Sequence, residues 1–210
     1  PISLGHIYAA FTEYLGFESF SDEYKVMGMA AYGRPRYLEQ IKLIFWPTPT
    51  GYEVDLSYFD FHLGKLPRYS GKLARIFGPP LKKGIPEIPE VYQDVAASLQ
   101  AQLEEVVFHL VGLATQAAGT RKLCLAGGVA MNCVVNGKIL QRKLVEDLYV
   151  PCCASDAGVS VGAAYLAHLY HEGLLERVLS ETALLGPQYS DSEVLTALKS
   201  ADLEKRGLSY

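Results

Sequence analysis

The sequence has no excess of basic residues, no long hydrophobic run and no repeated or low-complexity tract. Its 19 Lys and Arg residues against 23 Asp and Glu residues give a formal net charge of -4, so a basic surface for nucleic acid is not expected. No apolar stretch approaches the roughly 20 residues of a membrane-spanning helix, and no signal peptide opens the chain. We therefore expect a cytoplasmic protein that binds neither nucleic acid nor membrane. Because the chain begins at Pro1 without a starting Met, we also expect it to be a piece of a longer protein.

Cysteine is scarce and is not arranged for metal or disulfide chemistry. The four cysteines are Cys124, Cys133, Cys152 and Cys153, and none of them forms a CxxC pair. A disulfide framework is not expected in a chain this long and this apolar. We predict that the thiols are buried small hydrophobes in a reducing compartment.

Hydrophobic residues make up half of the chain, which is enough for a substantial core in 210 residues. Apolar residues at helical spacing predict helices over residues 5–15 and 89–118. Between them, a turn at residues 46–51 and a short strand at 52–56 predict a hairpin. The irregular, Pro-rich segment 57–90 that follows is either a functional excursion, such as a lid over a site, or a surface insertion without a chemical role.

The rest of the chain alternates between strands and helices. The predicted elements are a strand over residues 122–126, a helix over 131–142, a strand over 147–150 and a helix over 159–170. This order with short connections predicts an α/β fold. Gly186 and Pro187 indicate a boundary, and residues 193–203 predict a separate amphipathic helix.

The turn LAGGVAMN contains the first candidate binding residues. Gly127 and Gly128 have no Cβ, so a phosphate or a flat ligand can approach the backbone. The following helix directs its amide hydrogens and the positive end of its dipole at the same place, and Asn132 adds a polar side chain. The alternative is an ordinary tight turn between strand and helix, because the pattern is neither GxGxxG nor a Walker A loop.

The segment SDAG after the next strand contains the second candidate. Asp156 is expected where ligands collect in α/β folds, at the carboxyl end of a strand. A carboxylate there can bind a divalent metal or a hydroxyl. The alternative is a helix N-cap, which Ser155 or Asp156 could provide.

The segment DEYKVMGMAAYG contains the third candidate. Glu23 and Lys25 are two charged residues among apolar ones, and such a pair near an adenosine could bond the ribose and the base. The alternative is a solvated charge pair on the surface of an apolar helix.

Taken together, these segments resemble one family. EYKVMGMAAYG (residues 23–33), LCLAGGVAMNCVVNGKIL (123–140) and YVPCCASDAGVSVGAAY (149–165) are similar to the carbamoyltransferases of the nodulation-protein and antibiotic-carbamoylation type. The intervening segments YEVDLSYFDFH, IFGPP and DVAASLQAQLEE resemble the same family in the same order. The resemblance therefore covers nearly the whole chain.

The resemblance implies an architecture and an activity. Residues 1–184 would be the second half of an actin-like ATPase (ribonuclease H-like) domain, with 57–90 as an insertion. Residues 185–210 would be a linker and the start of an adenylate-forming domain. The enzyme would convert carbamoyl phosphate and ATP into carbamoyl-adenylate, and would then pass the carbamoyl group to a hydroxyl of a small molecule.

Site residues follow from the resemblance by position. The residues implied to face the nucleotide or nucleoside are Gly127, Gly128, Asn132, Glu23 and Lys25, and no residue is assigned a catalytic role. Asp156 is implied to bind a divalent metal, expected to be iron. A cation beside the adenylate would polarise the carbamoyl carbonyl and stabilise charge that develops during transfer.

The chain also departs from the family pattern. It has no HxxxH-like segment to supply the two other metal ligands, and it has neither the first phosphate-binding hairpin of the actin-like fold nor most of the second domain. We therefore expect that its partners include an N-terminal half-domain and a C-terminal adenylate-forming domain of the same protein, and that this chain alone does not turn over. A homodimer is left open.

Two other functions remain as alternatives. One is a phosphotransferase of the sugar or acetate kinase type, which would need a phosphate-transfer base and the absent hairpin. The other is a non-catalytic nucleotide-binding module that docks on a partner. The acceptor is equally open among nodulation factors, aminoglycosides, cephems and other hydroxyl compounds, and residues 57–90 are candidates for choosing among them.

Overall fold

The computed structural model describes residues 3–173 and 186–201. The chain divides into two compact units, Pro1–Leu174 and Leu175–Tyr210. The domain boundary expected at residues 184/185 lies outside the described residues. Among the residues that are described, no helix combines the length and the apolar character that crossing a membrane requires.

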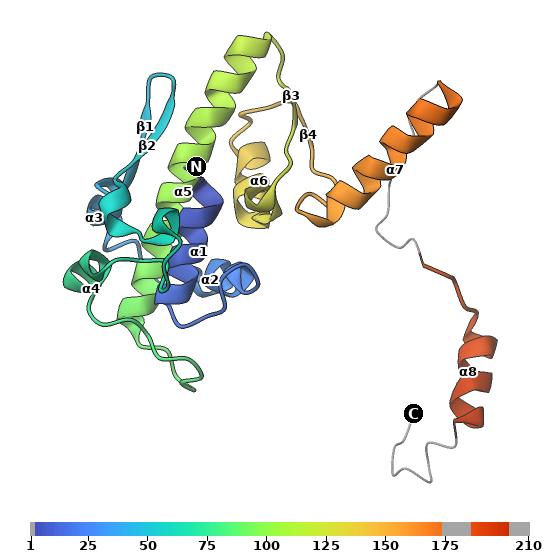
Figure 1. Ribbon diagram of the computed structural model, residues 1–210, viewed down its shortest axis with the longest axis horizontal. Helices are drawn as coiled ribbons and strands as arrows, with labels where there is room; N and C mark the ends of the chain where they lie inside the picture. Colours follow the sequence, from blue (N-terminus) through green and yellow to red (C-terminus); the bar gives the residue numbers. More distant parts are fainter. Residues whose placement is uncertain (1–2, 174–185, 202–210) are drawn as a thin grey trace. The chain divides into compact units, whose positions relative to one another are not determined.

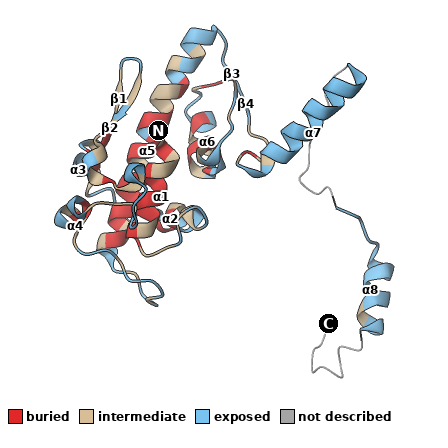
Figure 2. Ribbon diagram, in the orientation of Figure 1, coloured by how far each residue is buried: buried red, intermediate tan, exposed pale blue. Residues whose placement is uncertain are grey.

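The core of the first unit forms around two helices, α1 (Leu4–Tyr14) and α5 (Glu90–Ala118). Buried residues concentrate on α1 and on the part of α5 that it faces (Figure 2). Helix α1 is apolar around most of its circumference, which is typical of a helix buried on all sides. Helix α5 ends at Gly119, which adopts a φ of 62° and so provides the left-handed residue that commonly terminates a helix. Both helices were predicted from the apolar spacing, and the structure confirms them.

Several smaller elements pack against α5 (Figure 1). They are α2 (Glu23–Met29), α3 (Leu38–Lys42), α4 (Gly71–Phe77) and the strands β1 (Phe45–Thr48) and β2 (Gly51–Val54). The two strands pair antiparallel, with Phe45 opposite Val54 and Thr48 opposite Gly51. A hairpin is therefore confirmed, but residues 46–48, predicted as part of its turn, belong to β1.

Residues 57–90 are more ordered than their composition indicates. Besides α4, this stretch includes most of the short 3-10 helix η1 (Leu56–Tyr58) and all of η2 (Phe61–Leu63). Leu73 and Phe77 of α4 are buried in the core, and the Tyr14 hydroxyl donates a hydrogen bond of 2.7 Å to the carbonyl of Gly78. The segment is therefore anchored on the core.

The remaining elements of the first unit form the expected α/β alternation. Their order is β3 (Lys122–Cys124), η3 (Gly128–Met131), α6 (Cys133–Gln141), β4 (Asp147–Tyr149) and α7 (Ala157–Glu172). Strands β3 and β4 pair parallel in a two-stranded sheet, with Leu123 opposite Leu148. A mixed α/β class is therefore confirmed.

The prediction that the cysteines are buried is wrong. Cys124, Cys133 and Cys152 are exposed, Cys153 is half-buried, and all four are free thiols. Cys124 is exposed because inward and outward positions alternate along β3, and Leu123 takes the inward position.

The second unit contains α8 (Asp191–Ser200) among its described residues. Ser190 and Glu193 form a capping box: the Ser190 hydroxyl accepts from the Glu193 amide, and the Glu193 carboxylate accepts from the Ser190 amide. The helix agrees with the one predicted over residues 193–203, of which residues 202 and 203 lie outside the described part.

Candidate functional site

The Gly-Gly turn and the SDAG segment meet at the carboxyl ends of two paired strands. The amide of Leu125 donates to the carbonyl of Tyr149 at 2.9 Å, which extends the pairing of β3 and β4 by one residue. The amide of Gly127 then donates to the carbonyl of Ala154 at 2.7 Å. The two candidate segments are therefore tied together, at the edge where α/β sheets commonly bind ligands.

The turn exposes its backbone as the sequence predicts. Gly127 has a φ of 98°, a conformation that side chains other than glycine rarely adopt. A Cβ placed on Gly127 or on Gly128 would meet no atom within 4 Å. Open space therefore adjoins the turn, and a ligand can approach its backbone.

Asp156 lies exposed at the start of α7. It occupies the N-cap position but makes no side-chain capping hydrogen bond. Close packing fixes the segment nearby, because a Cβ on Gly158 would lie 2.3 Å from the carbonyl oxygen of Cys153. The capping alternative is thus not observed for Asp156, and its carboxylate is available to a ligand.

Asp156 does not stand in a ready-made metal site. Within residues 3–173 and 186–201, no three His, Cys, Asp or Glu groups lie together in a way that could hold a metal ion. Any metal at Asp156 would need donors from outside these residues.

Helix α2 lies beside the same region, but its two candidate charges do not pair with each other. The Lys25 ammonium contacts the Asp22 carboxylate at 2.8 Å, and this hydrogen bond lowers the pKa of Asp22 below its ordinary value. Glu23 instead accepts from the amide of Phe20 at 2.6 Å. The Cys133 thiol donates to the Met27 sulfur at 3.9 Å, so α2 reaches the start of α6.

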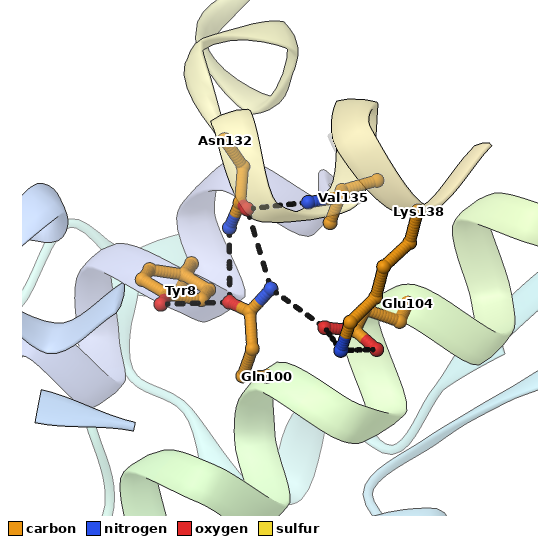
Figure 3. Close-up of polar contacts among 6 residues, drawn as sticks. All are labelled: Tyr8, Gln100, Glu104, Asn132, Val135 and Lys138. Carbon is orange, nitrogen blue, oxygen red and sulfur yellow. Dashed lines mark hydrogen bonds and ion pairs between the residues drawn. The ribbon is translucent and has the colours of Figure 1, made fainter. Parts of the chain in front are cut away.

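Asn132 points inward. Its side chain is 9% exposed, and its Oδ1 accepts from the amide of Val135 at 3.0 Å, which caps α6. Its amide also bonds twice to the side chain of Gln100 on α5 (Figure 3). The direct contact of Asn132 with a nucleotide stays a prediction. What the structure shows is that the Asn132 side chain joins the start of α6 to α5.

The buried polar residues around Asn132 were not predicted. They are Tyr8, Gln100 and Glu104, together with Lys138, which reaches Glu104 from α6 (Figure 3). A signal was present, because Gln100 and Glu104 are one helical turn apart among the apolar residues of α5. Their partners lie far away in sequence and could not be read from this spacing.

Burial raises the pKa of the Tyr8 hydroxyl above its ordinary value, and the nearby charges of Glu23 and Glu104 raise it further. The hydroxyl is therefore a neutral donor, and it gives its hydrogen to Gln100 Oε1 at 3.2 Å.

A separate cavity of about 370 Å³ adjoins the turn. Its walls come from α5, β3 and the turn itself, including Val107, Leu123, Ala126 and Val129. Because this lining is almost entirely apolar, the cavity suits hydrocarbon groups and not a phosphate.

Comparison with known proteins gives a consistent family. The sequence profile described as "Carbamoyltransferase N-terminus" matches residues 1–165. An uncharacterized protein of Synechocystis is 36% identical over 207 residues, which cover 95% of this chain and 33% of that protein. The nodulation protein NolO of Bradyrhizobium diazoefficiens is 39% identical over 171 residues, covering 78% of this chain and 28% of NolO.

A third relative agrees with these two. The nodulation protein NolNO of Sinorhizobium fredii is 38% identical over 171 residues, covering 78% of this chain and 22% of NolNO. The chain thus spans a third or less of the length of these relatives. Because the profile covers most of its residues and a relative 36% identical matches nearly all of it, this chain belongs to the carbamoyltransferase family.

Proposed function

We propose that this chain forms one wall of the nucleotide site of an O-carbamoyltransferase that works through carbamoyl-adenylate. The observation that carries the proposal is the hydrogen bond from Gly127 to Ala154, which places two glycines and an exposed aspartate at one strand edge. Family membership supplies the carbamoyl chemistry. The open turn supplies a place for the nucleotide.

The fold proposed for this wall is the second half of an actin-like ATPase domain. The order α5, β3, turn, α6, β4, turn, α7, with β3 and β4 parallel, supports it. In this arrangement the phosphates would lie on the backbone of Gly127 and Gly128, near the start of α6. The nucleoside would extend toward Glu23 and Lys25 on α2.

The proposed reaction proceeds in two stages. Water releases phosphate from carbamoyl phosphate, and an oxygen of the resulting carbamate attacks the α-phosphorus of ATP. Pyrophosphate leaves and carbamoyl-adenylate remains. The hydroxyl oxygen of the acceptor then attacks the carbonyl carbon, its proton passes to solvent, and AMP leaves.

Asp156 is proposed as one ligand of a divalent metal, with iron the expected ion. Its exposed carboxylate, engaged in no capping bond, is chemically suited to this. The described residues do not form a complete metal site; a cation held in part by Asp156 would polarise the carbamoyl carbonyl in the transfer stage. The other ligands, like the adenylate-forming domain, would come from polypeptide beyond what this chain supplies.

The test is to mix a full-length protein that contains this chain with ATP and carbamoyl phosphate and to follow pyrophosphate. Pyrophosphate release supports the adenylate route. Release of ADP without pyrophosphate would instead support a phosphotransferase, and nucleotide binding without any product would support a non-catalytic module. If no nucleotide binds, the proposal is wrong.

Asp156→Ala separates the two stages, with Asp147→Ala as its control. Both aspartates are exposed, and Asp147 begins β4 whereas Asp156 lies beyond the strand's other end. We expect Asp156→Ala to keep pyrophosphate release but to lose carbamoyl transfer and bound metal. Asp147→Ala should keep all three.

A further inference from the structure

A chain of buried hydrogen bonds connects helix α1, through helix α5, to Asn132, which follows Gly128 by four residues and caps α6 (Figure 3). The Tyr8 hydroxyl donates to Gln100 Oε1, and the Asn132 Nδ2 donates to the same oxygen at 2.9 Å. In return, Gln100 Nε2 donates to Asn132 Oδ1 at 3.2 Å. The two amides therefore form a reciprocal pair, and Gln100 is only 5% exposed.

The two ends of this chain dictate how both amides are oriented. At one end, the amide of Val135 needs an acceptor, so Asn132 must present its oxygen there. At the other end, the Glu104 carboxylate accepts from Gln100 Nε2 at 3.1 Å, so Gln100 must present its nitrogen. Turning either amide over would oppose two acceptors or two donors, and buried groups left in that state are costly.

The carboxylate that sets this orientation is itself held in place. Lys138 of α6 contacts the two oxygens of Glu104 at 2.6 and 2.7 Å. The Glu104 side chain is 7% exposed, so its charge would be costly without that partner. Helix α6 is thus held to α5 both at its cap residue Asn132 and at Lys138.

We propose that Gln100 is a positioning residue for the proposed nucleotide site: by orienting Asn132 it holds the turn of Gly127 and Gly128 in its binding geometry. This inference rests on the proposed function.

The test compares Gln100→Leu with Gln102→Leu. Gln102 is the same residue type on the same helix and is fully buried, but its Nε2 donates to the carbonyl of Phe45 on β1. Gln100→Leu removes four buried side-chain hydrogen bonds and Gln102→Leu removes one, and only the first change disconnects Asn132 from α5. Gln100→Glu is a second, isosteric variant, which places an acceptor where Nε2 now donates.

The first measurement is amide hydrogen exchange over residues 127–136 without any ligand. We expect Gln100→Leu and Gln100→Glu to exchange there about tenfold faster than Gln102→Leu, the size expected for an unpaired buried polar group. The second measurement is ATP affinity, with an expected loss of about tenfold for the Gln100 variants only.

The outcomes distinguish failure of the proposed nucleotide site from failure of the positioning role of Gln100. If the unaltered protein binds no ATP but the exchange rates differ as expected, the proposed function fails and the positioning of the turn by Gln100 stands. If ATP binds and the Gln100 and Gln102 variants match in exchange and in affinity, the positioning role is overturned. If exchange differs while affinity does not, the turn is positioned but not for nucleotide, which also overturns the proposal.

Discussion

Asn132 combines two roles that one substitution can separate. Its oxygen caps α6 and its nitrogen donates to Gln100. Asp is as good a cap as Asn, but its second oxygen would face Gln100 Oε1 and would lack a proton at neutral pH. Turning the Gln100 amide would not help, because Oε1 would then face Glu104.

Asn132→Asp should therefore destabilise the protein at pH 7 by about 1–3 kcal/mol. Burial and the negative charge of Glu104 should raise the pKa of the new carboxyl, and the positive charge of Lys138 should lower it. Tyr8 and Glu23 are the other titratable groups nearby. If the pKa of the new carboxyl is higher in the folded protein than in the unfolded chain, the full loss of stability is seen at pH values above the folded pKa. The loss disappears at pH values below the pKa of the unfolded chain, about 3.9. Urea midpoints of the variant and the unaltered protein should thus converge as the pH falls from 7 to about 4.

Asn132→Ser is the control for this prediction. Serine can also cap α6 but cannot reach Gln100, and it does not titrate. Its stability loss should therefore stay constant as the pH falls from 7 to about 4. An Asn132→Asp variant that matched the unaltered protein at pH 7 would show that the Asn132 nitrogen is dispensable.

For single residues, the sequence predicts where the backbone turns better than it predicts which side chains contact each other. Gly127 and Gly128 could be identified because a strand, two glycines and a helix in succession define a turn locally. Glu23 and Lys25 were read as a pair because they are close in sequence, but a helix turns them apart, and Lys25 finds Asp22 at the i−3 position. Gln100 was missed because its partner is 32 residues away.

At the scale of elements, the close approach to α5 of the segment that follows α2 depends on one glycine. A Cβ on Gly33 would lie 2.0 Å from the backbone oxygen of Gln93. The neighbouring Arg34 amide donates to Asp94 at 2.7 Å, which fixes the same contact from the other side. Because backbone atoms cannot move aside as the end of a flexible side chain can, the contact between residue 33 and α5 requires glycine.

Gly33→Ala should lower stability by at least about 1–3 kcal/mol through overpacking. Gly28→Ala is the matched control, because Gly28 lies within α2 with no atom near its Cβ position. That change should stabilise the helix by up to about 1 kcal/mol. The midpoint temperatures of thermal unfolding of the two variants should shift in opposite directions. Equal shifts would show that the contact of Gly33 with α5 does not require glycine.

Helix α8 gives a prediction for pH. None of its residues is buried, so it depends on its capping box. The hydrogen bond from the Ser190 amide, then that from its hydroxyl, lowers the pKa of Glu193 below its ordinary value. Because the folded pKa is lowered, the stabilisation is present above the unfolded value of about 4.3 and is lost as pH falls through the folded value.

Carbon chemical shifts of α8 should accordingly show less helix at pH 3 than at pH 7. Glu193→Gln should lose most of this dependence, because glutamine also completes a capping box and does not titrate. Helicity that is equal at both pH values in the unaltered protein would rule out the carboxylate as the stabilising group.

Helix α5 was predicted and helix α4 was not, for a physical reason. Helix α5 repeats its apolar positions over 29 residues, so the pattern is unambiguous. Helix α4 has only seven residues within a Pro-rich stretch, and it forms because Leu73 and Phe77 reach the core. Tertiary contact of this kind leaves no periodic signal.

For the whole molecule, the surface around β4 and α7 indicates a site that is not complete. Parallel sheets are usually covered on both faces, yet Tyr149 of β4 is 42% exposed. Helix α7 has no buried residue, and its Val159 and Leu166 are 72% and 51% exposed (Figure 2). The matched residues make up only 33%, 28% and 22% of the three relatives. We propose that corresponding polypeptide covers this surface and completes the site.

This chain by itself should therefore give no carbamoyl transfer from ATP and carbamoyl phosphate to any hydroxyl acceptor. The reason is that its described residues supply one carboxylate, Asp156, and no complete metal site, while an adenylate needs contacts on both sides to be held in reacting geometry. Adding polypeptide that corresponds to the rest of a full-length relative should restore transfer, and should also slow hydrogen exchange in α7. Asp156→Ala should abolish the restored transfer without preventing assembly. Transfer by the 210-residue chain without added polypeptide would contradict the proposal that its nucleotide site has only one wall.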